Sequence, residues 1–448
     1  MVDILPFRGI RYDTAAAGAE LTDLVAPPYD VISPSEQNAL YARHPANVVR
    51  LILGREENKY REAARLFHLW QASGILKADD VPSLYVYHQT FNDPATGKKA
   101  PDRIGLICLL KLEEYSAGNV LPHEKTLTGP KTDRLELLRA TQAQFESIYG
   151  LYSDPDCAVQ SFLREYDDRE IVIEEVGNAI GSTHKVERIS DPDAQSVLCE
   201  MLLDKQIFIA DGHHRYETAL NYRREIRAQR SDIPDDTPLA EDYVLITLTA
   251  FEDEGLLVLP THRLVRNVEP AKVAALPLTL AERFTLSASS PEGIEAEIAA
   301  LAAQGKVAFG IVLPPGAVQL AVLNATQSEL PGLVPGDGSD AVKCLPVTLL
   351  GTLVLSEVLG IDAAAVAAGG HVSYSREISE ALSSVANGTA QAAFLLGRPT
   401  VAEIKAVSLA GDVMPQKSTF FFPKLLSGLV LRDLRLDAPA EALQANAK

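Results

Sequence analysis

Residues 207–219 have the sequence IFIADGHHRYETA and carry the strongest structural signal in the chain. The short apolar run Ile207–Ala210 predicts a buried strand, and His213 to Arg230 predict a helix, with Gly212 allowing a tight turn between them. A helix start exposes unpaired N–H groups and a partial positive charge, so it attracts phosphate or another anion. The sequence therefore predicts an α/β fold with an anion site at this turn.

Ionisable side chains crowd the first turn of this predicted helix. An arginine such as Arg215 can bind a phosphate with two hydrogen bonds, and a histidine can donate to an anion or relay a proton near neutral pH. The sequence predicts an anion or phosphate site at which His213, His214 and Arg215 gather, and His213 and His214 are also catalytic candidates.

Two alternative roles remain open for the same residues. Asp211 could simply cap the helix while the histidines satisfy buried backbone groups, although His-His-Arg is costly to bury unpaired. His213 and Glu217 lie four residues apart on one helix face, which is a spacing used for metal chelation. No third metal ligand stands at a diagnostic spacing.

A second polar cluster is predicted between a strand and a helix, in the segments PHEKT (122–126) and GPKTDR (129–134). Glu124 is a candidate general base, and His123, Lys125 and Lys131 are candidate phosphate ligands. The alternative is a solvated loop with ordinary surface charges.

Two further segments contain basic residues beside predicted strands. MPQKSTFFFPK (414–424) has an aromatic run typical of a core strand, and it could return Lys417 to an active site from a distant part of the chain. Its Lys-Ser-Thr lacks the upstream glycines of a phosphate loop. The segment THR (261–263) either adds a basic group or forms a simple turn.

The overall composition is that of a globular protein. The chain has 448 residues, 47% hydrophobic and 23% charged, with a formal net charge of −19. This mix excludes wholesale disorder, and the acidic balance argues against a large nucleic-acid surface. Neither a secretion signal nor a membrane span is expected. Four cysteines without CxxC spacing fit a reducing cytoplasm; they are Cys108, Cys157, Cys199 and Cys344.

A shift in composition predicts two domains. Residues 1–266 would form the catalytic region with the HEKT and DGHHRY motifs, and residues 267–448 a C-terminal α+β region with the MPQKST motif. Within the first region, the apolar run Val48–Leu53 predicts a buried strand. The runs Tyr243–Ala250 and Leu256–Leu259 predict a hairpin.

Several long motifs make the chain similar to a known family. PFRGIRYD, APPYDVIS, LPHEKTLTGPKTDR, ADGHHRYETA, LPTHRL and MPQKSTFFFPKLLSGLV closely resemble the hallmarks of the bacterial and archaeal family called domain of unknown function 1015. The DGHHR element is similar to that of the ParB/sulfiredoxin superfamily, which includes free-serine kinases. The resemblance implies a ParB/sulfiredoxin-like core with insertions, in which Asp211 to Arg215 hold nucleotide phosphates. It also implies an acidic base, for which Glu124 and Glu36 are the candidates.

These observations lead to the hypothesis of a phosphotransferase that acts on a small hydroxylated metabolite, with free L-serine as the best single candidate. The donor would be ADP, ATP or pyrophosphate, with Mg²⁺ shielding its charge. Lys125 and Lys131 would stabilise the leaving phosphate, and Glu124 would orient the hydroxyl. The expected partners are this substrate and donor, without nucleic acid or membrane; the oligomeric state is not predicted.

Two other functions share the same site. A phosphatase acting on phosphoserine or a similar monoester would use water as the acceptor. A ParB-like regulatory or partition module would bind a nucleotide without transferring its phosphate. A purely structural protein would leave the cluster from Asp211 to Arg215 without a role.

Overall fold

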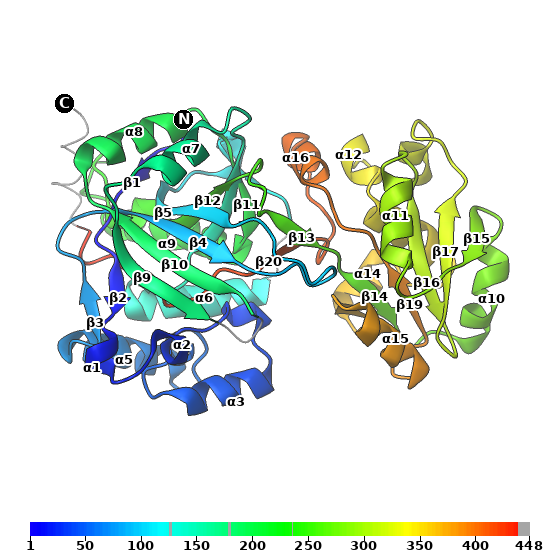
Figure 1. The fold of residues 1–448 in the computed structure, drawn as a ribbon, viewed down its shortest axis with the longest axis horizontal. Coiled ribbons are helices and arrows are strands. Elements are labelled where there is room, and N and C mark those ends of the chain that lie inside the picture. Colours follow the sequence, from blue (N-terminus) through cyan, green and yellow to red (C-terminus); the bar gives the residue numbers. More distant parts are fainter. Residues whose placement is uncertain (125–127, 178–180, 235, 438–448) are drawn as a thin grey trace. The chain divides into compact units, whose positions relative to one another are not determined.

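The computed structural model describes residues 1–124, 128–177, 181–234 and 236–437 of the chain. The chain divides into two compact units, which are coloured by sequence in Figure 1. Unit 1 contains Met1–Pro122, Thr126–Leu257 and Pro423–Lys448, and unit 2 contains His123–Lys125 and Val258–Phe422. Each unit combines helices with a sheet, so the predicted mixed α/β class is confirmed. Within the described ranges, no helix is both long and apolar enough to cross a membrane.

Unit 1 is built around a mixed sheet that has nine strands among the described residues. The strand order is β6-β11-β8-β12-β5-β4-β10-β9, and β1 pairs with β5. The strands are β1 (Ile4–Leu5), β4 (Leu84–Thr90), β5 (Arg103–Lys111), β6 (Val120–Pro122), β8 (Ile148–Tyr152), β9 (Glu170–Gly177), β10 (Thr183–Ile189), β11 (Ile207–Asp211) and β12 (Tyr243–Ala250).

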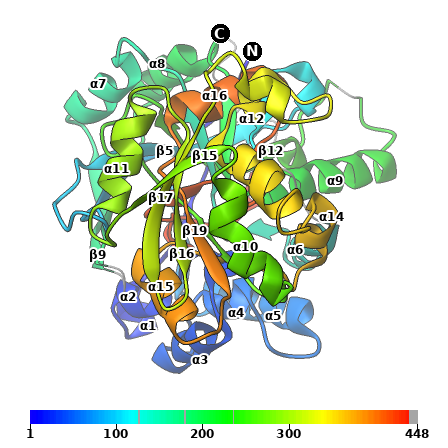
Figure 2. The same cartoon turned by 90° about the vertical axis from the view of Figure 1, so that its right-hand side faces the viewer.

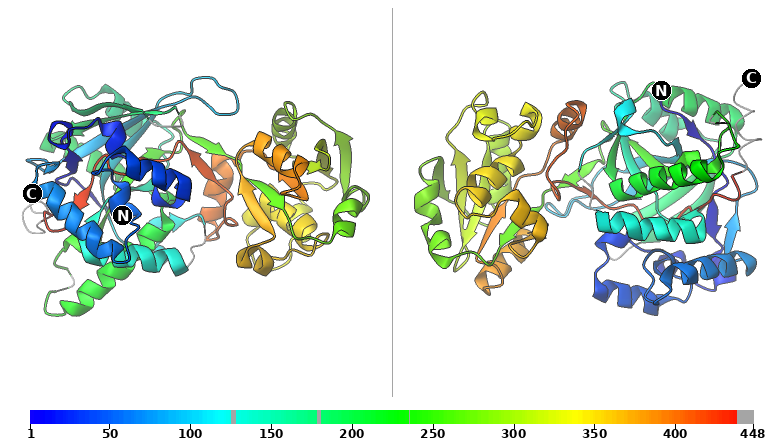
Figure 3. Two further views of the ribbon diagram at one scale, coloured as in Figure 1. Left: turned by 90° about the horizontal axis from the view of Figure 1, so that it is seen from below. Right: turned by 180° about the vertical axis from the view of Figure 1, so that it is seen from behind.

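Three helices share an apolar core with this sheet, because each presents a stripe of large apolar side chains. They are α7 (Ala158–Glu165), α8 (Pro192–Leu202) and α9 (His213–Gln229), and they contribute Leu163, Leu198 and Tyr216. α6 (Thr128–Thr141) lies beside α9, as the right-hand view of Figure 3 shows. These packed helices fix the position of the strand-to-helix turn between β11 and α9.

A second apolar core joins α6 to the helices of the N-terminal segment. The left-hand view of Figure 3 shows these N-terminal helices in blue. The elements of this part of unit 1 are α1 (Thr14–Ala17), α2 (Leu21–Leu24), η1 (Tyr29–Val31), α3 (Pro34–Arg43), α4 (Val49–Ile52), α5 (Lys59–Ala72), β2 (Ile10–Tyr12) and β3 (Leu76–Ala78). Unit 1 also contains two further short 3₁₀ turns, η2 (Tyr115–Ala117) and η3 (Ala240–Asp242).

The strand predicted for Val48–Leu53 is wrong, because these residues form the short helix α4. Asn47 supplies the physical reason. Its Oδ1 accepts the backbone N–H of Val49 at 2.9 Å, and its Nδ2 donates to the carbonyls of Asp23 and Val25 at 2.7 and 3.0 Å. The amide side chain therefore fixes a turn at the point where the apolar run begins, and the run continues as a helix.

Unit 2 contains an antiparallel sheet with the order β15-β17-β16-β19-β14-β18, which is seen together with its covering helices in Figure 2. One core includes Leu276, Phe309 and Leu353, and another includes Ile298 and Ala381. The strands are β14 (His262–Val265), β15 (Phe284–Ala288), β16 (Ala308–Leu313), β17 (Ala317–Leu323), β18 (Val372–Ser375) and β19 (Ala392–Leu395). The helices are α10 (Pro270–Leu280), α11 (Ile294–Ala302), η4 (Leu330–Leu333), α12 (Asp340–Lys343), α13 (Pro346–Leu349), the π-helix η5 (Leu350–Ser356), α14 (Ala363–Ala368), α15 (Ile378–Ala386) and α16 (Val401–Leu409).

The hairpin predicted from Tyr243–Ala250 and Leu256–Leu259 is also wrong. β13 (Leu257–Leu259) pairs with β20 (Phe420–Phe422), and β12 pairs with β5 and β8 instead. Both predicted strands exist, but the aromatic run of β20 supplies the partner from a distant part of the sequence.

The last described segment returns to unit 1. Ser427 and Leu431 form backbone bridges with Ala26 and Ile10, and β21 (Arg432–Asp433) pairs with β7 (Ala143–Gln144). The predicted boundary between residues 266 and 267 therefore differs from the structure, in which unit 2 starts its main segment at Val258 and ends at Phe422. A shift in amino-acid composition along the chain can indicate a new domain. It does not show that a later segment pairs with an earlier one, as the segment after Phe422 does with unit 1.

Candidate functional site

The predicted strand, turn and helix around the DGHHR motif are confirmed. β11 ends at Asp211, Gly212 has φ 87° and ψ 27°, and α9 begins at His213 without a side-chain cap. A Cβ atom at Gly212 would lie 2.9 Å from Nε and Nη2 of Arg215. Two observations favour glycine at position 212. Its backbone is in the left-handed region, and the guanidinium of Arg215 folds back against its Cα.

Asp211 holds two cations at this helix start. Nζ of Lys424 lies 2.5 Å from Oδ1 of Asp211, and Nη2 of Arg215 lies 3.0 Å from Oδ2. Burial would raise the pKa of Asp211, but Lys424 and Arg215 lower it to about 2. Asp211 is therefore a carboxylate at neutral pH. The alternative in which Asp211 merely caps the helix is wrong, because Gly212 occupies the cap position and the carboxylate binds side chains instead.

A buried network continues from Arg215 toward the N-terminal segment. Arg215 donates through Nη1 to the carbonyl of Ser147 at 2.7 Å. Glu146 accepts the backbone N–H of Tyr29 at 2.9 Å, and its Oε2 lies 3.6 Å from Nη1 of Arg134. The guanidinium of Arg134 stacks 3.9 Å from the centre of the Tyr29 ring. Two arginines are thus held on either side of one buried carboxylate.

The charge of Arg215 is secured by several acidic groups. Burial alone would lower the pKa of Arg215, but Glu146, Asp211 and Asp30 raise it above its ordinary value. Asp30 is exposed, so it is a carboxylate at the surface within electrostatic range of Arg215.

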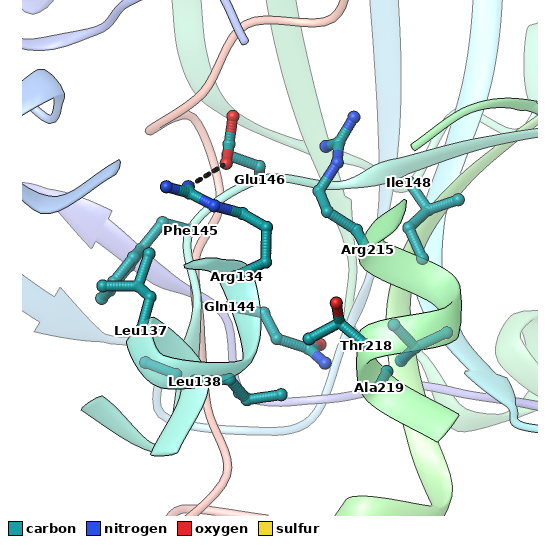
Figure 4. A pocket seen from close by; sticks show the side chains of 12 residues that line it. Arg134, Leu137, Leu138, Gln144, Phe145, Glu146, Ile148, Arg215, Thr218 and Ala219 are labelled. Carbon is teal, nitrogen blue, oxygen red and sulfur yellow. Dashed lines mark ion pairs between the residues drawn. The ribbon is translucent and has the colours of Figure 1, made fainter. Parts of the chain in front are cut away.

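A pocket opens beside this network, between α6, α9 and the segment that contains β7 and β8. Figure 4 shows the head groups of Arg134, Glu146 and Arg215 in its upper part, and apolar side chains below them. Leu137, Leu138 and Ala219 belong to this apolar part. Guanidinium groups recognise phosphate and carboxylate, so the charged end of the pocket suits an anionic group.

Lys424 is carried to Asp211 by a backbone segment that neighbouring side chains of unit 1 hold in place. Gln89 donates through Nε2 to the carbonyl of Lys424 at 3.3 Å, and Arg103 donates to the carbonyl of Pro423. The backbone N–H of Leu426 donates to the hydroxyl of Tyr87 at 3.4 Å. The position of Lys424 therefore depends on buried side chains of β4 and β5.

The two histidines of the motif both lie in the first turn of α9. His213 is 8% exposed, and it lowers the pKa of Asp211 together with Lys424 and Arg215, against the effect of burial. His214 is half-buried. Their predicted part in phosphate binding stays a prediction.

Lys131 is held by an ion pair on the neighbouring helix. Its Nζ lies 2.8 Å from Oε2 of Glu217, so the predicted phosphate ligand already has an acidic partner. In this ion pair, Glu217 already uses the carboxylate that would have to bind a metal ion together with His213. Among the described residues, no group of three or more His, Cys, Asp or Glu side chains could hold a metal ion.

The described residues do not fit a magnesium site built by protein side chains. Both oxygens of Asp211 are taken by cations, and its neighbours Arg215 and Lys424 are themselves cationic. Mg²⁺ requires oxygen ligands in near-octahedral geometry.

The HEKT motif lies in unit 2 where the structure describes it. His123 is hydrogen-bonded through Nε2 to Oγ1 of Thr419 at 2.8 Å, and Oε1 of Glu124 accepts the backbone N–H of Lys417 at 2.7 Å. Two predicted motifs, HEKT and MPQKST, thus come together. Lys125 lies outside the described residues. That Glu124 and Lys417 act with the DGHHR motif stays a prediction.

Glu36, the other candidate base, has a structural role. Its carboxylate accepts the backbone N–H of Ser33 at 2.8 Å, and its own N–H donates to the Ser33 hydroxyl at 3.3 Å. This reciprocal capping box starts α3. Sequence reasoning missed Lys424, Arg134 and Glu146, although Lys424 stands in the same quoted motif as Lys417.

A family model described as protein of unknown function (DUF1015) matches residues 4–348. The chain belongs to this family. No curated protein matches this DUF1015 chain. The solved structures that resemble it include a free serine kinase in complex with AMP, with 13% identity and a TM-score of 0.33 over 68% of this chain and 84% of that one.

Two other solved structures resemble this DUF1015 protein to the same degree. A conserved hypothetical protein from Pyrococcus furiosus has 15% identity and a TM-score of 0.33, over 71% of this chain and 94% of that one. SbnI from Staphylococcus aureus, with a C-terminal truncation, has 10% identity and a TM-score of 0.34, over 76% and 93% of the two chains.

Proposed function

We propose that this protein is a phosphotransferase that moves a phosphoryl group from ADP, ATP or pyrophosphate to a small hydroxylated metabolite, with free L-serine as the first acceptor to test. The observation that carries the proposal is the pair of cations that Asp211 holds at the start of α9. Lys424 and Arg215 stand there beside a helix terminus that itself favours anions.

Phosphoryl transfer asks mainly for positioning and for stabilisation of negative charge. In the proposed reaction, the acceptor oxygen attacks phosphorus, the bond from phosphorus to the leaving phosphate oxygen breaks, and the hydroxyl proton passes to a carboxylate. Arg215 and Lys424 would bind the phosphate oxygens, and His213 and His214 would donate to the transferred group.

The base is to be chosen between two carboxylates. Glu124 is the candidate from the sequence, and Asp30 is added because it lies within electrostatic range of Arg215. Replacing each by its amide, as Glu124→Gln and Asp30→Asn, removes the proton acceptor with little change in shape. Loss of turnover with unchanged donor binding is expected for the base alone.

The decisive experiment incubates the full chain with L-serine and each donor in a buffer containing Mg²⁺, and follows the products by ³¹P NMR. Phosphoserine formation is expected with one of the donors. Release of phosphate from phosphoserine alone would favour the phosphatase instead. Nucleotide binding without either product would favour a regulatory module and contradict the proposed transfer.

We also propose that this reaction takes place in the cytoplasm. All four cysteines are free, which supports a reducing compartment. Fractionation of cells that express the tagged chain tests this part, and recovery in a membrane or secreted fraction would contradict it.

A further inference from the structure

Unit 2 contains a pocket that the proposed reaction leaves without a role. Its lining comes from several elements of unit 2, and its apolar wall includes Ile298 of α11, Ala308 of β16, Val347 of α13, Leu396 and Met414. The described residues that line it include none of those assigned to the proposed phosphate site. A concave, mainly apolar lining with a few polar groups is typical of a site for a small molecule.

The pocket lies at one end of three neighbouring strands. β19 lies between β14 and β16 and pairs with both in antiparallel orientation (β16 and β19 are labelled in Figure 2). The residues that precede β14 and β16 therefore lie at the same end of the sheet as the residues that follow β19. Thr261, Lys306 and Arg398 stand at these three positions, and all three line the pocket.

Thr261 of the LPTHRL motif contributes a buried hydroxyl group to this pocket. The residue is 7% exposed, and its carbonyl accepts a hydrogen bond from Arg263. Among the residues that the structure describes, its hydroxyl has no hydrogen-bond partner. A polar group that is buried without a partner lowers stability, so this O–H favours a ligand atom that accepts a hydrogen bond.

The other hydroxyl groups of the lining are already engaged. Ser418 of the MPQKST motif donates to the carbonyl of Pro415, and Thr400 donates to Oε2 of Glu403 at 2.8 Å. Of the described lining residues, Thr261 is therefore the one whose hydroxyl can donate to a ligand without giving up a bond within the protein.

The charged side chains of the lining differ in how they are balanced. Nε of Arg398 lies 2.9 Å from Oε1 of Glu295, and Oε2 of Glu403 accepts the backbone N–H of Thr400 at 2.7 Å in the capping box of α16. Lys306 is exposed, and within the described part of the chain its ammonium group has no ion pair. A single anionic group at the mouth of the pocket would give Lys306 a counter-ion.

These groups define the ligand by its chemistry and by its length. β19 separates β14 from β16, and strands two apart in a sheet lie roughly 10 Å from each other. The flexible stem of Lys306 shortens the span from Thr261, so a chain of about six carbons fits it. A second negative charge would be repelled by Glu403. We infer that this pocket binds a small oxo acid, with its carboxylate on Lys306, its apolar body on the wall and its carbonyl oxygen on the hydroxyl of Thr261.

Ligand-observed NMR titration of the full chain with four probes tests the ligand class: 5-oxohexanoate, hexanoate, 2-hexanone and acetate. Hexanoate lacks the carbonyl group and should bind about five-fold more weakly than 5-oxohexanoate. 2-Hexanone lacks the carboxylate and should bind about three-fold more weakly, and acetate lacks the apolar body and should show no binding. Absence of 5-oxohexanoate binding, or equal binding of hexanoate and 5-oxohexanoate, would overturn the assignment.

Variants of Thr261 test the hydrogen bond. Thr261→Val has nearly the same shape without the hydroxyl, so it should bind 5-oxohexanoate and hexanoate equally, whereas Thr261→Ser should keep the preference for 5-oxohexanoate. Ser418→Ala is the matched control, because the hydroxyl of Ser418 is already engaged with Pro415. A wild-type preference in a folded Thr261→Val protein would overturn the role of Thr261.

Lys306→Met tests the carboxylate contact. This variant should bind 5-oxohexanoate and 2-hexanone equally, because the counter-ion of the carboxylate is lost. Lys272→Met is the control, since Lys272 is exposed in α10 and lies outside the described lining of the pocket. Equal loss of the preference in both lysine variants would reduce the contact to general attraction and overturn the role of Lys306.

Ala302→Phe tests the location of the site. Ala302 is exposed near the end of α11 and lines the pocket, so a larger side chain there should fill the pocket without disturbing the core. Loss of 5-oxohexanoate binding with an unchanged melting temperature is expected. Wild-type affinity in the folded Ala302→Phe protein would overturn the inference.

The inference stands without the proposed reaction, because no phosphoryl group takes part in it. Phosphoryl transfer by the Ala302→Phe protein should equal that of the wild type. Binding of 5-oxohexanoate that depends on Thr261, in a protein without transfer activity, would support the inference and reject the proposed function.

Discussion

At the scale of single residues, Lys424 is the most informative side chain of the proposed phosphate site. It reaches Asp211 from a segment more than two hundred positions later, since its ion pair joins residues with a sequence separation of 213. The ion pair restricts the movement of the Lys424 ammonium group beside the start of α9. The backbone of Lys424 is restricted as well, because its carbonyl accepts a hydrogen bond from Gln89. A fixed cation needs little reorganisation when it binds a phosphate.

Lys424→Met should therefore lower the affinity for the phosphoryl donor by about ten- to a hundred-fold, with a smaller effect on the acceptor. Donor binding measured by isothermal titration checks this. Arg224→Met in α9 is the control, because Arg224 forms an exposed pair with Glu114. Equal loss in both variants, or none in Lys424→Met, would remove Lys424 from the site.

Two buried histidines give the protein a defined response to acid. Burial lowers the pKa of His262 to about 4 and that of His184 to about 3, from an ordinary value of 6.5. Both groups take up a proton on unfolding, so the stability they contribute is fully present above pH 6.5 and is lost as the pH falls toward these values. Each should reduce the free energy of unfolding by up to about 1.4 kcal/mol per pH unit in that range.

Urea denaturation between about pH 7 and pH 5 measures this slope. His262→Gln keeps an acceptor for the N–H of Leu396, which donates to Nδ1 of His262 at 3.2 Å. Its slope should correspond to one proton fewer than that of the wild type. An unchanged slope would mean that His262 is protonated in the folded protein.

At the scale of elements, the start of α3 shows that Glu36 has a structural role. Ser33 caps α3, with Pro34 as the first helical residue and Glu36 closing the capping box. The capping residue therefore stands directly before Pro34–Ser35, and these two residues already belong to the helix. The carboxylate of Glu36 is engaged in the backbone of its own helix, which gives it a structural function.

Ser33→Ala should lower the free energy of unfolding by about 1 kcal/mol, and Glu36→Gln should leave both stability and turnover nearly unchanged, because glutamine also serves in a capping box. Thermal unfolding and the ³¹P NMR assay measure the two effects. A folded Glu36→Gln protein without turnover would restore Glu36 as the base.

The elements also show which parts of the site the sequence could predict. β11, Gly212 and α9 are encoded locally, by an apolar run, a glycine and a long helical segment. The run Val48–Leu53 has the same apolar character as a buried strand, and the deciding contact comes from the side chain of Asn47. The partners of Asp211 and Glu146 could not be predicted, because they come from pairing between distant segments.

At the scale of the whole molecule, the segment after Phe422 completes unit 1. Arg432 is fully buried and donates to the carbonyl of Ala240 at 2.7 Å, and β21 pairs with β7. A chain that ends after Phe422 should therefore lose cooperative unfolding of unit 1, which circular dichroism and calorimetry can follow. The full-length Lys424→Met protein is the control, since it lacks the cation but keeps the segment. A truncated chain as stable as this control would contradict the role of the segment.

The return of this segment also sets the time at which the site is finished. During translation, Asp211 and Arg215 leave the ribosome long before Lys424, because unit 2 is made between them. A nascent chain can form β11 and α9 early, but the proposed phosphate site lacks its lysine until residue 424 has been made. Ribosomes that stall before residue 424 would release a chain without this lysine, so we expect the proposed activity only from chains that extend past it.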